Sequence, residues 1–333
     1  MNKYFSLLII FIVQVYSCKK TGADNSAMHI GTKPDVYLTG SLNGLAVYWK
    51  NDSAFYPPAG DNLMGIYVSG NDVYVGGTAF KTSTNAVAAY WKNDSLVILS
   101  DGTNEAFVYS MFVSGNDVYL AGIEDVLVPV VMGAVAKYWK NGTTVTLPET
   151  GSDDAYGIFV LGNDVYVAGD GNVAEYWKNG NPVVLDTTSY SYATSVYVSG
   201  NDVYAAGNVF NGAHFMAAYW KNGNRVILSD SSRNANASSM FVSVTDVYVA
   251  GFESNGTHNV AKYWKNGGAV SLTDGTQDAA ATSIFVFGKD VYVAGMLNNG
   301  FSAAQYWKNG IPVFLSNVAN DTHTSSIFVK YPL

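Results

Sequence analysis

Seven copies of one short segment organise this sequence. The tetrapeptide Tyr-Trp-Lys-Asn recurs with its tryptophan at Trp49, Trp91, Trp139, Trp177, Trp220, Trp264 and Trp307, which are all the tryptophans of the chain. Successive copies are separated by 38 residues (139 to 177) to 48 residues (91 to 139). This period matches a repeat unit of four short β-strands, so the chain is expected to be a tandem array of such units.

A second segment, Asp-Val-Tyr, precedes each Tyr-Trp-Lys-Asn and allows one unit to be divided into strands. Over 194–228 we predict strands at Thr194–Val198, Asp202–Ala206, Ala218–Trp220 and Val226–Leu228. The last two are joined by Asn222-Gly223, a pair that tolerates the positive φ angles of a tight hairpin. Successive strand residues such as Ile284, Phe285 and Val286 are all apolar. Strands of that kind are expected where each sheet is packed between two others.

The two ends of the array complement each other. The first unit begins at its second strand, at Asp35, and the chain ends in Ser326-Ile327-Phe328-Val329, which is a first strand without a second. Pairing these two strands completes a seventh unit and removes two exposed sheet edges. We therefore predict an all-β fold, a seven-bladed β-propeller over 35–333, whose ring is closed when the C-terminal strand completes the N-terminal blade.

The N-terminus has the pattern of an export signal. Lys3 is followed by an apolar run from Tyr4 to Val15, which is too short to span a bilayer. The segment Val15-Tyr16-Ser17-Cys18 resembles the lipobox of bacterial lipoproteins, and Cys18-Lys19-Lys20 looks like the start of lipoproteins of the Bacteroidetes. The resemblance implies a signal peptide at 1–17, lipidation of Cys18, a polar tether over 18–34, and a cell-envelope location at the outer membrane, on its periplasmic side or the cell surface. The alternative is an ordinary signal peptide with an incidental cysteine.

The repeat itself resembles one family. The mature chain is similar to bacterial extracytoplasmic β-propellers built from tandem Tyr-Trp-Lys-Asn-Gly blades. It lacks the Gly-His and Trp-Asp signature of WD repeats, and its adjacent Tyr and Trp do not fit the kelch spacing. This resemblance implies a scaffold and no particular activity, because propellers carry many functions.

Composition excludes several classes of function. The net charge is −8 and the acidic residues are spread along the chain, which argues against nucleic-acid binding. The single cysteine excludes a disulfide framework and cysteine-based zinc sites. No nucleophile motif, phosphate loop or zinc motif is present, so we expect no cofactor. These absences favour a monomeric binding protein over an enzyme. Calcium is left open, through Asp153-Asp154 or Glu124-Asp125, although neither pair has spaced ligands. A metal held by the variable-loop histidines His214, His258 and His323 is also left open, although they belong to different blades.

Strand connectivity separates two faces of the ring. The turns between strands one and two, and between three and four, are nearly identical in all units and form a constant face. The loops between strands two and three and between blades form a variable face, and such diversified loops usually carry recognition. We expect the repeated aspartates and lysines to pair near the constant face. On the variable face acids exceed the bases Lys81 and Arg233, which favours cations or neutral polar ligands.

Aromatic residues indicate a binding site on the variable face of the third to fifth blades. Tyr109 and Tyr156 are predicted to begin first strands, Tyr190 and Tyr192 to precede one, and Phe210 to lie in the neighbouring loop. With acidic neighbours they offer a platform for a neutral sugar ring. The candidate ligand-binding residues are Tyr109, Tyr156, Tyr190, Tyr192, His214, Phe215, Asp153 and Asp154.

Three functions follow from these observations. The first is a lipid-anchored binding or interaction module, for a neutral glycan or an envelope protein. The alternative is a polysaccharide hydrolase or lyase that uses dispersed carboxylates such as Asp153, Asp154 and Asp170. The third is a structural subunit of an envelope complex, bound through a predicted apolar loop at Val126–Met132.

Overall fold

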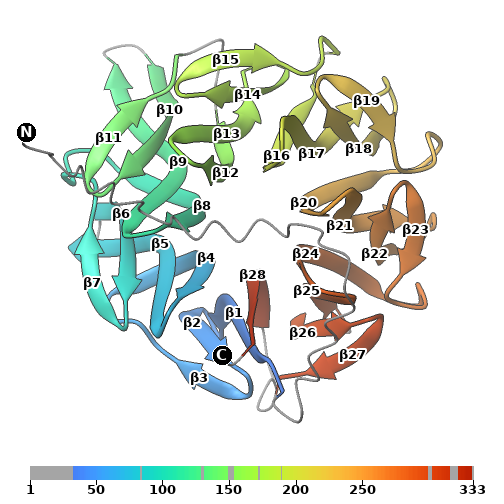
Figure 1. Cartoon of the computed structure of the whole chain (residues 1–333), viewed down its shortest axis with the longest axis horizontal. Helices are drawn as coiled ribbons and strands as arrows, with labels where there is room; N and C mark the ends of the chain where they lie inside the picture. The colour runs from blue at the N-terminus through green and yellow to red at the C-terminus, as the bar shows by residue number, and fades with distance from the viewer. Residues whose placement is uncertain are drawn as a thin grey trace, which may run out of the picture. The chain divides into compact units, whose positions relative to one another are not determined.

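The described part of the chain forms seven antiparallel sheets of four strands each, arranged in a ring (Figure 1). The computed structural model describes residues 33–82, 85–128, 131–148, 154–171, 173–188, 190–298, 302–315 and 322–331. These ranges contain no α-helix, and thus none long and apolar enough to cross a bilayer. The predicted seven-bladed β-propeller is confirmed.

Each sheet is one blade, and the blades follow one another along the chain. Each blade contains four strands, and their order below runs from the centre of the ring outward. Blade 1 has β28 (Thr322–Lys330), β1 (Asp35–Leu42), β2 (Leu45–Lys50) and β3 (Ser53–Phe55); blade 2 has β4 (Gly60–Ser69), β5 (Asp72–Thr82), β6 (Asn85–Lys92) and β7 (Ser95–Ile98); blade 3 has β8 (Ala106–Ser114), β9 (Asp117–Val128), β10 (Val131–Lys140) and β11 (Thr143–Thr146). Blade 4 has β12 (Asp154–Leu161), β13 (Asp164–Asp170), β14 (Ala174–Lys178) and β15 (Asn181–Val184); blade 5 has β16 (Tyr192–Ser199), β17 (Asp202–Phe210), β18 (Phe215–Lys221) and β19 (Asn224–Ile227). Blade 6 has β20 (Ala235–Ser243), β21 (Asp246–Ser254), β22 (Asn259–Lys265) and β23 (Gly268–Ser271); blade 7 has β24 (Asp278–Phe287), β25 (Asp290–Asn298), β26 (Ser302–Lys308) and β27 (Ile311–Phe314).

The ring closes as predicted. β28 pairs antiparallel with β1, from Asp35 opposite Lys330 to Leu42 opposite Thr322. Figure 1 shows β28 at the centre of the ring beside β1, the first strand of the chain. Because the closing strand is the inner strand of its blade, it contributes to the central wall as well as to the sheet.

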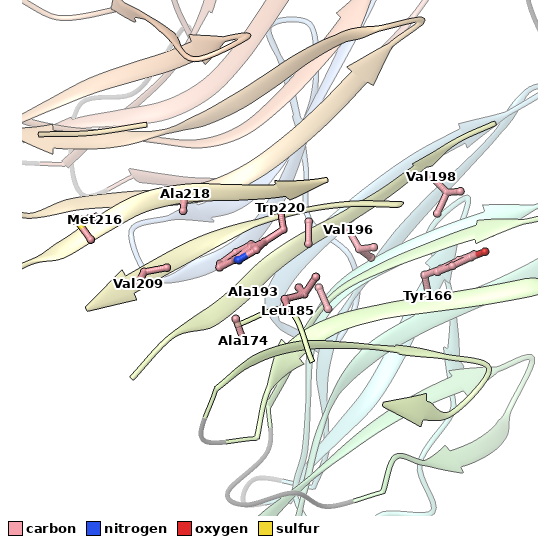
Figure 2. Packing of buried hydrophobic residues seen from close by; sticks show 12 residues of the cluster. Tyr166, Ala174, Leu185, Ala193, Val196, Val198, Val209, Met216, Ala218 and Trp220 are labelled. Carbon is pink, nitrogen blue, oxygen red and sulfur yellow. The ribbon is translucent and has the colours of Figure 1, made fainter. Parts of the chain in front are cut away.

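The core consists of separate clusters between successive blades. Each tryptophan of the repeat is buried, with at most 2% of its surface exposed. In Figure 2, Trp220 of blade 5 lies against Ala174 and Leu185 of blade 4 and Val196 of its own blade. The equivalent clusters join the other neighbouring blades. This arrangement explains why the strands are apolar on both faces.

The repeated polar residues form the same network in every blade, as predicted. In blade 5 the Asp202 carboxylate accepts from Lys221 Nζ at 2.8 Å and from Asn222 Nδ2 at 2.8 Å. The Asn222 side-chain oxygen in turn accepts the backbone N–H of Val203 at 2.9 Å, and Lys221 Nζ lies 5.2 Å from the centre of the Tyr204 ring. Equivalent ion pairs occur in the other six blades. The network therefore holds strands two and three together at the constant face.

Every inner strand also contains a β-bulge, which the repeat pattern did not predict. At the same position each inner strand has a residue without a partner in the register of the strand beside it: Met64, Tyr109, Tyr156, Thr194, Ser238, Thr282 and Ser325. β4 has a second such residue, Asp61. The second strand carries a glycine near each bulge, five residues after the aspartate of Asp-Val-Tyr. At Gly207 an added Cβ would overlap the carbonyl oxygen of Tyr192, and the equivalent glycines are equally restricted. The repeat therefore contains glycine where the bulge brings two backbones together.

One constant-face turn departs from the repeat. Between inner and second strands, blades 2, 3, 4, 5 and 7 place a glycine at φ near +60°, whereas blade 6 places Val244 at φ +58°. A β-branched residue is strained in this region. We expect Val244→Gly to stabilise the protein by about 1 kcal/mol in chemical denaturation. The converse change Gly200→Val in blade 5 should destabilise it by a similar amount, and a destabilising Val244→Gly would refute the assignment of strain.

Candidate functional site

The bulges create a cavity at the centre of the ring. Inner-strand residues alternate between the blade core and the channel, but a bulge places two consecutive residues on the channel side. In blade 6 these are Ser238 and Ser239, and both line a central cavity of about 120 Å³. The bulged residues of the other blades line it too, from Met64 to Ser325. Since inner strands begin at the variable face, these residues lie on the variable-face side of the channel.

A closed ring of aromatic side chains lies below this cavity, towards the constant face. Each inner strand contributes one: Tyr67, Phe112, Phe159, Tyr197, Phe241, Phe285 and Phe328. Each contacts the next at centroid distances of 4.5 to 5.5 Å, and Phe328 contacts Tyr67 to complete the circle. Burial raises the pKa of Tyr67, and burial together with Tyr67 raises the pKa of Tyr197 to about 12, so both remain neutral phenols. We call this ring the aromatic floor.

The cavity wall is uncharged and rich in hydroxyl groups. The serines that follow the bulges accept hydrogen bonds from backbone N–H groups of the next blade. Ser195 Oγ accepts from the Met240 N–H at 3.3 Å, and Ser283 Oγ accepts from the Ile327 N–H at 3.2 Å. A serine that accepts such a bond still has its own O–H to donate. The wall therefore joins the blades and presents hydrogen-bond donors to the cavity.

An unbroken run of aromatic rings leads from the cavity across the variable face. Tyr109 lies 5.7 Å from Tyr156, and Tyr156 lies 6.1 Å from Tyr192. Tyr192 contacts Phe215 at 6.0 Å, Phe215 contacts Phe210 at 5.0 Å, and Phe210 contacts Tyr190 at 6.1 Å. We call these six residues the aromatic run. It crosses blades 3, 4 and 5, and its first two members also line the cavity.

Two carboxylates accompany the inner part of this run. The Tyr156 hydroxyl donates to Asp154 Oδ2 at 2.9 Å, and the backbone N–H of Asp154 donates to Asp170 Oδ1 at 3.3 Å. Burial and the charges of Asp170 and Asp154 raise the pKa of Tyr156, so its proton stays available for donation. Burial, with Asp154 and Asp125, likewise raises the pKa of Tyr109 to about 12. The site therefore combines neutral aromatic faces with anionic hydrogen-bond acceptors.

The outer end of the run is conformationally strained. Tyr190 is 71% exposed and has φ +60°, a conformation that tyrosine rarely adopts. Its ring stands edge-on to Phe210, at an interplanar angle of 90°. An exposed, strained aromatic residue contributes little to folding, and such residues concentrate at functional sites.

The structure brings most of the predicted site residues together. The aromatic run contains five of them, Tyr109, Tyr156, Tyr190, Tyr192 and Phe215. Asp154 accepts a hydrogen bond from the Tyr156 hydroxyl. His214 lies beside Phe215 in a turn where its backbone N–H donates to Asn211 Oδ1 at 2.8 Å, and its ring stacks with no member of the run in the described residues. Asp153 lies outside the described residues, as do Cys18 and the predicted signal peptide and tether up to residue 32.

Some placements differ from the prediction. Tyr109 and Tyr156 do not begin their strands but are bulged residues within β8 and β12, and Tyr192 is the first residue of β16 rather than preceding it. Of the predicted apolar loop at Val126–Met132, residues 126–128 belong to β9 and residues 131–132 belong to β10. Both strands continue because the register of the pair is unbroken to Val128 opposite Val131.

The variable face is also less acidic than the sequence suggested. Glu124 pairs with Lys137, Glu253 pairs with Lys262, and Asp186 pairs with Arg225 at 2.8 Å. These bases lie in the third and fourth strands, so counting loop residues alone missed them. In the described ranges no group of three His, Cys, Asp or Glu residues is positioned to hold a metal ion. His258 and His323 lie in blades 6 and 1, where His258 faces Asp278 at 3.8 Å and His323 faces Met296 at 3.3 Å.

Comparison with known proteins supports the fold and nothing finer. The protein is a seven-bladed β-propeller, but no protein-family model and no curated protein matches its sequence. Among solved structures it is similar to the acylaminoacyl peptidase of Pyrococcus horikoshii, with a TM-score of 0.53 and 11% sequence identity. The similarity covers 86% of this chain and 53% of the peptidase, so the chain spans about half of that protein.

Proposed function

We propose that this protein is a binding module that recognises a neutral glycan on its variable face. The observation that carries the proposal is the aromatic run, which starts in the central cavity and continues across three blades. A pyranose has an apolar face that packs on aromatic rings and hydroxyls that donate to carboxylates. Tyr156, Asp154 and Asp170 supply both kinds of contact within one part of the surface.

The first test removes two rings of the run. Tyr156→Ala with Tyr192→Ala should weaken binding to a glycan array about thirty-fold, because each ring contributes about 1 kcal/mol of stacking. Tyr56→Ala serves as the matched control, since Tyr56 is 54% exposed and lies outside the run. The melting temperature should change little in both, whereas Trp220→Ala should lower it strongly because Trp220 is fully buried. Unchanged glycan binding by the double variant would place the site elsewhere.

The lipid anchor is part of the same proposal and rests on the sequence around Cys18. If Cys18 carries the lipid, Cys18→Ala should move the protein from the membrane fraction to the soluble fraction after export. Cys18 is the only cysteine, so the change affects no other thiol. A wild-type protein that is already soluble after export contradicts the anchor without affecting the glycan proposal.

One observation favours an enzyme as the second candidate. The Tyr156 hydroxyl donates to Asp154, and the charge of Asp170, which accepts from the Asp154 backbone, also raises the pKa of Tyr156. Paired carboxylates are the machinery of glycoside hydrolysis. A hydrolase should release new reducing ends from a bound polysaccharide and lose this activity in Asp154→Asn. A binding module should release none.

A further inference from the structure

We propose that the constant face rests on an anionic bilayer and contacts it through a patch on three consecutive blades, 6, 7 and 1. This inference rests on the proposed lipid anchor and adds an orientation to it. The described chain enters the ring at the constant face, because Lys33 and Pro34 lead directly into Asp35, the constant-face end of β1. Residues 19–32 separate Lys33 from Cys18, at most about 50 Å of extended chain. A lipid on Cys18 therefore tethers the ring by its constant face.

Blade 7 departs from the repeat in its constant-face turn. Blades 2, 3 and 5 have Ser-Gly-Asn there, as in Ser114-Gly115-Asn116, whereas blade 7 has Phe287-Gly288-Lys289. Phe287 is 46% exposed. The equivalent turn of the neighbouring blade 6 holds the strained Val244, which is 75% exposed. Serine, glycine and asparagine satisfy the fold in other blades, so these exposed apolar side chains indicate contact with another surface.

Aromatic and basic residues of blade 1 adjoin this turn. Phe287 stacks on Tyr331, with 4.2 Å between the ring centres, and the Tyr331 hydroxyl donates to Asp290 at 3.2 Å. Lys330 precedes Tyr331 at the end of β28, and Lys33 lines a pocket with Tyr292. We call the following residues the seam patch: Lys33, Val244, Phe287, Lys289, Lys330 and Tyr331.

The seam patch has a positive charge, unlike the variable face. The repeat lysines of the constant face are paired with repeat aspartates, but three lysines of the patch form no ion pair with a described residue: Lys33, Lys289 and Lys330. Asp52, which lines one pocket with Lys33, offsets part of their charge. Carboxylates such as Asp61, Asp125 and Asp274 lie at the variable face. An anionic bilayer therefore attracts the constant face and repels the variable face.

The first test measures vesicle binding without the anchor. The full-length Cys18→Ala chain, which cannot be lipidated, should bind phosphatidylcholine vesicles with about one third phosphatidylglycerol better than pure phosphatidylcholine vesicles, and high salt should remove the difference. In that chain, Phe287→Ser with Lys289→Asn gives blade 7 the turn of blade 3. It should weaken binding about ten-fold or more, since one lysine near an anionic surface accounts for about five-fold. Adding Val244→Gly should weaken binding further while it raises stability.

The matched control removes the same kinds of side chain from the variable face. Leu45→Ser with Arg233→Asn replaces one base and one apolar residue that is 62% exposed, and vesicle binding should not change. Glycan binding should be unchanged in the seam-patch variant, because no residue of the patch belongs to the aromatic run.

The second test measures orientation in the anchored protein. Thr245→Cys and Thr257→Cys each provide one site for a fluorophore, on opposite faces of blade 6, and both residues are exposed. In vesicles that carry the lipidated protein, a quencher on the lipid head group should reduce the emission of the label at residue 245 and spare the label at residue 257.

The outcomes separate this proposal from the anchor and from glycan binding. Equal binding of the seam-patch variant and its parent to anionic vesicles overturns the proposal, as does equal quenching of the two labels. Failure of the anchor appears elsewhere, as a wild-type protein that is soluble after export, and the vesicle result of the Cys18→Ala chain still decides whether the patch binds a bilayer.

Discussion

Removal of β28 should prevent this protein from folding. A chain that ends at residue 321 lacks the only partner of β1 on the channel side and one member of the aromatic floor. It also loses the burial of Ile327, Phe328 and Val329. At about 1.5–3 kcal/mol for each side chain the loss is roughly 5–9 kcal/mol, comparable to the whole stability of a typical protein. We expect an insoluble product or loss of the cooperative melting transition.

The same variant allows a rescue experiment. A peptide of residues 322–331 added during refolding should restore solubility and the melting transition, because it supplies the missing strand by sheet addition. A scrambled peptide of the same composition is the control. A truncated chain that melts like the full-length protein would show that the ring does not depend on its closure.

A methyl group at Gly207 should have the second-largest effect. Its Cβ would overlap the Tyr192 carbonyl, which is fixed by the pairing of β16 with β17. Either the bulge or the sheet must move, and we expect Gly207→Ala to cost about 3 kcal/mol or more in denaturant unfolding. Gly268→Ala, on the exposed outer strand β23, should cost less than about 1 kcal/mol, since its Cβ meets only one atom at 3.3 Å. Similar costs for both variants would contradict the tight approach at the bulge.

The fold was predictable because its determinants recur in the sequence. Asp-Val-Tyr and Tyr-Trp-Lys-Asn mark the second and third strands of every blade, and the incomplete ends at Asp35 and Val329 indicate closure. The strands are longer than predicted, however. β17 extends to Phe210 and β9 to Val128, because cross-strand pairing continues beyond the residues that repeat.

The candidate site was predictable only in part. Tyr109 and Tyr156 are adjacent because they occupy the same bulge position in neighbouring blades. Their adjacency could be predicted because both lie near the variable-face ends of neighbouring inner strands. The hydroxyl groups of the cavity wall could not be predicted, because no single residue type occupies the bulge position. Different blades have methionine, tyrosine, threonine or serine there. A signal was present in the serine that recurs before Met-Phe, Val-Tyr and Ile-Phe in the inner strands, as at Ser110, Ser195 and Ser283.

The bulges give the ring a set of channel-facing positions that lie outside its apolar core. The bulged residues lie outside the apolar clusters between neighbouring blades. Two of them contact the next blade through hydrogen bonds instead, because Thr194 Oγ1 donates to the Ala237 carbonyl at 2.8 Å and Thr282 Oγ1 lies 3.3 Å from Thr324 Oγ1. These seven positions hold methionine, tyrosine, threonine or serine around one chamber, while the tryptophans, glycines and ion pairs of the repeat stay the same. A substitution that keeps the hydrogen bonds to the next blade can therefore change the lining of the central cavity and leave the apolar contacts between the blades as they are.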